Sequence, residues 1–132
     1  MRSGLNGLTV LVADDERYIT ATISLKLRQA GAKVLIASDG VEAFEIARID
    51  RPDLICSGHR MPLMNGLELA ERLRKAPETA HIPMLMITSR SHRISPGEFA
   101  GTNIRGLLAK PFSTRELLAK LQEVAFDVGI AA

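Results

Sequence analysis

The sequence has little cysteine and few aromatic residues. It contains one cysteine, Cys56, and no tryptophan, and aromatic residues make up 4% of its 132 residues. A single cysteine excludes an internal disulfide framework. No apolar stretch approaches the roughly 20 residues that cross a bilayer, and the opening residues, MRSGLNG, lack the apolar segment of a signal peptide. We therefore expect a cytoplasmic protein whose lone cysteine, Cys56, is a small core residue.

An excess of charge of one sign is absent as well. The formal net charge is +2 and there is no run of lysine and arginine, so direct binding to nucleic acid is not expected. Apolar residues make up 46% of the chain, which is enough for a mainly aliphatic core. The length predicts one domain over residues 1–132.

Short apolar runs alternate with helix-like segments along the whole chain. The runs cover residues 8–12, 33–37, 53–57, 84–88 and 107–109. They are continuous rather than alternating, which is typical of strands buried on both faces in a parallel sheet. Helices between them are then expected on both faces. Residues 89–106 break this pattern with Pro96 and three glycines, and predict at most a short, weak helix.

The helix-like segments carry start signals and apolar stripes. Capping pairs are expected at Asp39 and Glu42, Asn65 and Glu68, and Ser113 and Glu116. Gly31 and the pair Arg51-Pro52 are expected to end the first two helices. The predicted buried stripes are Ile19, Ile23, Leu27 and Ala30, then Val41, Phe44 and Ala47, then Leu69 and Leu73, and finally Leu117, Leu121, Val124 and Val128.

Residues with reactive or charged side chains lie at the ends of three of the predicted strands, but not at the end of the third. Asp14 and Asp15 follow the first run, Thr88 ends the fourth, and Lys110 follows the fifth. The third run is followed by Gly58, which has no side chain. Open parallel sheets bind ligands beyond the carboxyl ends of their strands. Two acids, a hydroxyl and a lysine there have the layout of a phospho-acceptor site, but glycine stands where the acceptor is expected.

Four segments together resemble the receiver domain of two-component response regulators. They are VLVADDE at 10–16, PDLI at 52–55 followed by MPLMNG, the Thr88-Ser89 strand end, and KPF at 110–112. The resemblance covers about residues 7–126. It implies an α/β fold with a doubly wound, five-stranded parallel sheet, flavodoxin-like, in the strand order 2-1-3-4-5.

The resemblance assigns the acceptor and metal positions. In that family a carboxylate three residues before the Met-Pro takes a phosphoryl group from a histidine kinase, and here this residue is Gly58. Asp14 and Asp15 match the acids that help bind Mg²⁺. The backbone carbonyl of Arg60 matches a further ligand. Because one charged ligand is lost at position 58, Mg²⁺ binding is expected to be weak or absent.

The remaining family positions fall on the fourth and fifth strands. Thr88 and Lys110 match the residues that contact the phosphoryl oxygens. Leu107 stands at the position that usually carries a switching aromatic residue, and by analogy the Lys110-Pro111 bond is cis. With position 58 neutral, we expect Arg60 or Arg90 to turn inward toward Asp15, because a guanidinium group pairs well with a carboxylate.

Three functions agree with these residues. The first is a receiver-like module that acts through protein–protein interaction without phosphorylation. The second is an inactivated, Asp-to-Gly form of an ordinary phospho-accepting regulator. The third is a magnesium-dependent phosphohydrolase that uses Asp14, although such an enzyme needs a second acid where Glu16 stands. Ser57 and His59 are the alternative acceptors. Because successive side chains of a strand point to opposite faces, Ser57 is expected on the face opposite to that of position 58.

The expected partners are proteins. The resemblance favours a histidine kinase or a separate output protein, bound through the face formed by the fourth helix, fifth strand and fifth helix. No helix-turn-helix segment follows residue 126, so the output is expected from another chain. A homodimer is a further alternative.

Overall fold

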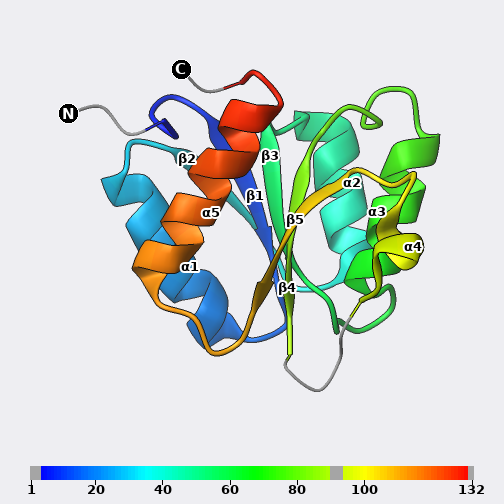
Figure 1. Ribbon diagram of the computed structural model, residues 1–132, viewed down its shortest axis with the longest axis horizontal. Helices are drawn as coiled ribbons and strands as arrows, with labels where there is room; N and C mark the ends of the chain where they lie inside the picture. Colours follow the sequence, from blue (N-terminus) through cyan, green and yellow to red (C-terminus); the bar gives the residue numbers. More distant parts are fainter. Residues whose placement is uncertain (1–3, 90–93, 131–132) are drawn as a thin grey trace.

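The computed structural model of the protein describes residues 4–89 and 94–130 and has a five-stranded sheet at its centre (Figure 1). The strands lie in the order β2-β1-β3-β4-β5 and are parallel. They are β1 (Thr9–Ala13), β2 (Lys33–Ala37), β3 (Leu54–Gly58), β4 (Met84–Thr88) and β5 (Ile104–Ala109). The helices are α1 (Arg17–Gln29), α2 (Gly40–Asp50), α3 (Gly66–Lys75), α4 (Pro96–Phe99) and α5 (Thr114–Asp127). The predicted fold class is confirmed.

Helices cover both faces of the sheet, as the continuous apolar strands predicted. Figure 1 shows α1 and α5 on one face and α2 and α3 on the other. Successive residues of a strand point to opposite faces, so Val10 and Val12 enter the core under α1 and α5 while Leu11 enters the core under α2 and α3. Every residue of β3 and β4 is buried. These two strands therefore form a rigid centre for the residues that follow them.

Three strands differ from the sequence prediction in their boundaries. Strands β1 and β3 begin and end one residue later than expected, and β5 begins at Ile104 rather than at residue 107. Glycines at 58 and 106 caused two of these errors, because glycine is a poor strand former. In the fold Gly58 pairs with Ile87 of β4. At Gly106 a Cβ atom would lie 3.0 Å from Val124 Cγ2, so this glycine allows α5 to pack closely on β5.

The predicted helix caps are largely confirmed. Asn65 with Glu68 and Ser113 with Glu116 each form a reciprocal capping box. Asp39 also accepts a hydrogen bond from the Glu42 amide. The Glu42 carboxylate, however, accepts from the Ser38 amide rather than from Asp39, so this start is only half a capping box.

Two residues of the predicted buried stripes lie on the surface. Val41 is 44% exposed, because α2 instead packs through Gly40, Ala43 and Ala47. A Cβ atom at Gly40 would overlap the backbone of Met64, and this close approach rotates Val41 outward. Val128 is 37% exposed because it is the C-cap of α5 rather than part of the helix. The other stripe residues are buried or half-buried.

The segment at 89–106 contains the short helix that was predicted. Helix α4 has four residues, with Pro96 in its first turn and a capping box between Ser95 and Glu98. Gly101, with φ +80°, follows its end. Arg90 lies outside the described residues. Within the described part of the chain, no helix has the length and apolar character needed to cross a membrane.

Candidate functional site

Asp14 lies directly after β1, at the carboxyl edge of the sheet, which is the lower edge in Figure 1. It is only 4% exposed. Its Oδ1 accepts a hydrogen bond from the Glu16 amide at 3.0 Å, while its buried Oδ2 has no hydrogen-bond partner among the described residues. Burial raises the pKa of Asp14, opposed by the Glu16 amide and by Lys110. The charged form of Asp14 is therefore incompletely compensated.

Lys110 lies opposite this acid, as the sequence predicted. Its Nζ is 3.9 Å from Asp14 Oδ2 and 3.0 Å from Glu16 Oε1. The Lys110 amide donates to the carbonyl of Thr88 at 2.7 Å, and the Lys110-Pro111 bond is cis, as the resemblance implied. Sequence reasoning missed the role of Glu16 as the closer partner of Lys110. The third consecutive acid of VLVADDE was the signal that could have found it.

Gly58 is the last residue of β3 and is buried beside Asp14. Its backbone is not in the left-handed region, so glycine is not required there for its conformation. A Cβ atom at this position would lie 2.7 Å from Asp14 Oδ2 and 3.2 Å from Asp14 Cγ. The Asp14 carboxylate thus occupies the space that a side chain at position 58 would enter.

These residues surround a cavity of about 350 Å³, here called the Gly58 cavity. It is lined by Asp14, Asp15, Glu16, Gly58, His59, Arg60, Ile87, Ser89 and Lys110. The fold therefore brings the predicted acids, Gly58 and Lys110 together.

Of the other predicted positions, His59 and Arg60 belong to the lining of this cavity, whereas Thr88, Leu107 and Ser57 do not. Thr88 is 6% exposed, and its neighbour Ser89 is the hydroxyl residue in the lining. Leu107 is half-buried in β5 and packs against the core under α2 and α3. The Ser57 hydroxyl is buried and donates to the Gly58 carbonyl at 2.9 Å, outside the residues that line the cavity. Arg60 lines the rim with an exposed side chain.

The acid cluster offers the oxygen ligands that Mg²⁺ prefers, but not the full number of them. One carboxylate oxygen each from Asp14, Asp15 and Glu16 lies within 4.8 Å of the others. Mg²⁺ prefers oxygen ligands in a strict octahedron. Gly58 supplies no side-chain oxygen, and Lys110 pairs with two of the three acids. These three carboxylates would hold the ion, but against a competing ammonium group.

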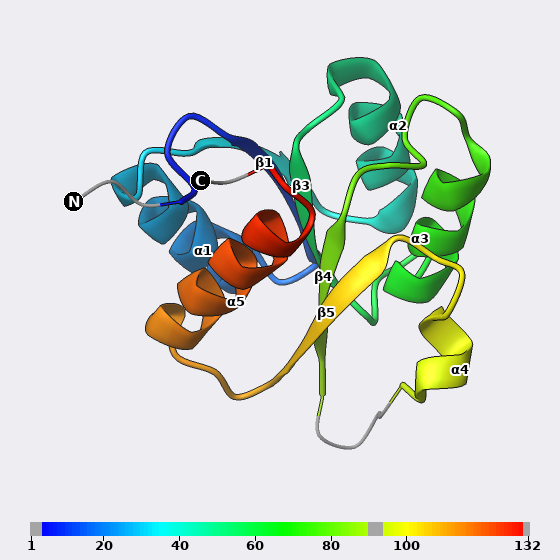
Figure 2. The ribbon, with the colours of Figure 1, turned by 45° about the horizontal axis from the view of Figure 1, so that its top comes forward.

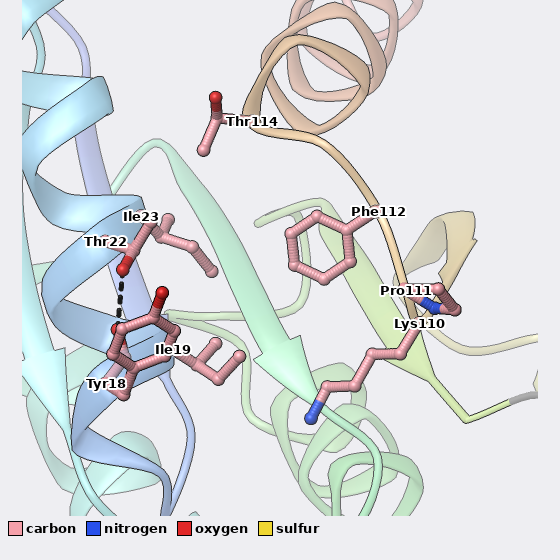
Figure 3. A pocket seen from close by; sticks show the side chains of 8 residues that line it. All are labelled: Tyr18, Ile19, Thr22, Ile23, Lys110, Pro111, Phe112 and Thr114. Atoms are coloured by element: carbon pink, nitrogen blue, oxygen red, sulfur yellow. Dashed lines mark hydrogen bonds between the residues drawn. The ribbon is translucent and has the colours of Figure 1, made fainter.

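A second cavity, of about 440 Å³, adjoins the first and shares Lys110 with it. It lies between α1 and the segment that joins β5 to α5. Figure 3 shows the Phe112 ring facing Ile19 and Tyr18, with the Lys110 side chain extending below it. Tyr18 is 80% exposed. This groove is mainly apolar, in contrast to the charged Gly58 cavity.

Comparison with known proteins agrees with the fold. The response regulator receiver domain family matches residues 10–122. The chain is 34% identical to the phosphate regulon transcriptional regulatory protein PhoB of Pseudomonas aeruginosa over 123 residues, covering 93% of this chain and 54% of PhoB. It is 32% identical to the alkaline phosphatase synthesis transcriptional regulatory protein PhoP of Bacillus subtilis, covering 93% of this chain and 50% of PhoP. It spans about half the length of these relatives.

Solved structures show the same fold. The chemotaxis response regulator CheY4 of Vibrio cholerae superposes with a TM-score of 0.82 at 35% identity, covering 89% of this chain and 98% of CheY4. The receiver domain of the sensor histidine kinase PA1611 of Pseudomonas aeruginosa, which holds a magnesium ion in its active-site cleft, gives 0.79 at 25% identity, covering 89% and 97%. The family match, the sequence identity and the fold agree, and the chain belongs to the family of response regulator receiver domains.

Proposed function

We propose that this chain is a receiver-like signalling module that acts by protein–protein interaction without being phosphorylated. One observation carries the proposal: Gly58, which the resemblance matches to the acceptor, ends β3 without a side chain, and Asp14 Oδ2 lies 2.7 Å from where its Cβ atom would lie. Phosphoryl transfer needs an attacking oxygen in line with the phosphorus. Position 58 provides none, so the proposal includes no catalytic step.

The two neighbouring nucleophiles are poor substitutes. The Ser57 hydroxyl donates to the Gly58 carbonyl and lies outside the cavity lining. His59 does line the cavity, which makes it the stronger of the two alternative acceptors. The phosphohydrolase function is not favoured, because Glu16 is engaged by Lys110 at 3.0 Å instead of being available as a second acid.

Weak Mg²⁺ binding forms part of the proposal. Asp14 and Asp15 remain, but no carboxylate stands at position 58 and Lys110 lies 3.9 Å from Asp14 Oδ2. A ligand that binds only the folded state raises the melting temperature by an amount that grows with its affinity. Millimolar Mg²⁺ should therefore leave the melting temperature nearly unchanged, and a large upward shift contradicts weak binding.

The proposed docking surface is the face made by α4, β5 and α5. Figure 2 shows β5 at the edge of the sheet with α5 on one side and α4 on the other. The segments of this face combine half-buried apolar residues of β5 with charged side chains such as Lys120 of α5. We place the module in the cytoplasm, with a histidine kinase or a separate output protein as its partner, and a second copy of the chain as the alternative.

Charge reversal on this face tests the proposal. Lys120 lies on the β5 side of α5, with its Cε 4.0 Å from the Cβ position of Gly106. Lys120→Glu should weaken capture of the partner about tenfold, equivalent to about 1.4 kcal/mol. Arg48→Glu on α2, where the native arginine pairs with Glu45, is the matched control and should have no effect. Pull-downs with purified histidine kinases and output proteins provide the measurement.

The Gly58→Asp variant separates this proposal from the inactivated-regulator alternative. If docking is constitutive, the wild-type chain and Gly58→Asp capture the same partner, with or without acetyl phosphate. Capture only by phosphorylated Gly58→Asp would instead support the inactivated form. Because a new side chain at 58 must first displace Asp14 Oδ2, uptake of phosphate by this variant should also depend on Mg²⁺ to reposition that acid.

A further inference from the structure

The Gly58 cavity contains a buried acceptor that the fold leaves unsatisfied. Asp14 is 4% exposed and its Oδ2 has no hydrogen-bond partner among the described residues. Lys110 lies 3.9 Å from this oxygen but makes its shorter contact, 3.0 Å, with Glu16. Buried carboxylate oxygens normally have a donor, and leaving one without a donor costs free energy. The cavity therefore presents an unused site for a hydrogen-bond donor.

The charges of the residues that line the cavity limit the kind of hydrogen-bond donor that can bind there. Three carboxylates line the cavity, from Asp14, Asp15 and Glu16, against the two basic side chains of Lys110 and Arg60. Among the described residues of the lining, the formal balance leaves one negative charge. A singly charged cation matches this remainder, whereas a divalent ion exceeds it and finds no side-chain oxygen at Gly58.

Space favours a side chain over a small ion. The cavity volume is about 350 Å³, and Asp14 and Gly58 are both part of its lining, with Asp14 Oδ2 filling the space directly beside Gly58. A guanidinium group is planar, keeps its charge at all working pH values and donates several hydrogen bonds in a fork. Its three-carbon stem lets it reach a buried acceptor from a protein surface.

We infer that the Gly58 cavity receives one arginine side chain from the protein partner. The guanidinium group of this arginine donates to Asp14 Oδ2 and takes the place of the metal ion and the phosphoryl group. This inference rests on the proposed function, because it supplies part of the contact that makes docking independent of phosphorylation. The charged carboxyl edge of the sheet then recognises the partner together with the α4, β5 and α5 face.

The test uses N-acetyl-arginine amide as the probe and N-acetyl-citrulline amide as its neutral isostere. The backbone amide signal of Gly58 in ¹⁵N–¹H correlation spectra reports binding. We expect saturable shifts at Gly58 and Asp15 with the arginine probe and none with citrulline. Asp14→Asn should weaken binding about tenfold, equivalent to about 1.4 kcal/mol, while Asp127→Asn, which removes an exposed acid of α5, should leave it unchanged.

Three results overturn the inference. They are shifts of equal size with citrulline, unchanged affinity in Asp14→Asn, and displacement of the arginine probe by Mg²⁺ at concentrations far below those at which the probe binds. The last result identifies the cavity as a divalent metal site instead. None of them affects the Lys120→Glu pull-down, so a failure here and a failure of the proposed function remain distinguishable.

Discussion

Replacing Asp14 by asparagine should stabilise the fold at neutral pH. The carboxylate is 4% exposed, one of its oxygens has no hydrogen-bond donor among the described residues, and its cationic neighbour Lys110 is shared with Glu16. Asparagine keeps an oxygen that can accept from the Glu16 amide, as Oδ1 does at 3.0 Å, and removes the buried charge. Replacing both members of a buried ion pair by apolar residues often stabilises a protein by about 1–4 kcal/mol, whereas removing one member destabilises it if the other charge is left buried and unpaired. Lys110 keeps Glu16 as its partner at 3.0 Å, so we expect a gain of about 1 kcal/mol, at the low end of that range.

The pH dependence gives this prediction its sign. Burial raises the pKa of Asp14 above the ordinary value of 3.8, so the folded state holds a proton that the unfolded state releases. The protein is therefore most stable at low pH, where Asp14 is protonated, and it loses stability as pH rises through the folded pKa of Asp14. The advantage of Asp14→Asn should grow as pH rises through the folded pKa of Asp14 and should vanish as pH falls below 3.8.

Urea unfolding of the two proteins at several pH values measures this difference. A gain of about 1 kcal/mol corresponds to a rise in melting temperature of about 3–5 °C for a domain of this size. Asp50→Asn, which alters an exposed acid of α2, is the matched control. Lower stability of Asp14→Asn at pH 7, or a gain that persists unchanged in acid, refutes the argument from an undercompensated buried charge.

Three further predictions concern the scaffold. Ser113→Ala removes the capping box of α5 and should lower the free energy of unfolding by about 1 kcal/mol, and an unchanged urea midpoint contradicts this. Leu63 has φ +70° and is 80% exposed. Leu63→Gly should stabilise the protein by about 0.5 kcal/mol, because the relief of backbone strain exceeds the entropy cost of ordering a glycine. A loss of stability contradicts this prediction. Burial raises the pKa of Cys56 to about 12, so this thiol should react with a disulfide reagent only after unfolding, and rapid reaction of the native protein speaks against the buried position.

The sheet and the gathering of the site could be predicted from the sequence because both depend on local patterns. Five continuous apolar runs require burial on both faces, and parallel strands place their carboxyl ends at one edge. Asp14, Gly58 and Lys110 could therefore be assigned to one site from their positions in the chain alone. The fold confirms that these three residues meet around one cavity.

Contacts that depend on tertiary packing could not be predicted from these local patterns. Nothing in the spacing of the acids indicated that Lys110 would lie closer to Glu16 than to Asp14. The direction of Val41 depended on how closely Gly40 approaches Met64, which no helical period encodes. The inward turn of Arg60 toward Asp15 remains a prediction, and the same prediction for Arg90 falls outside the described residues.

Intact-mass measurement after incubation with acetyl phosphate and Mg²⁺ tests the central claim most directly. Because Gly58 offers no attacking oxygen and Asp14 Oδ2 fills the space beside it, the wild-type chain should show no phosphate adduct. A wild-type adduct, with fragmentation locating it at His59 or Ser57, contradicts the account and makes the protein a phosphorylated regulator with a displaced acceptor.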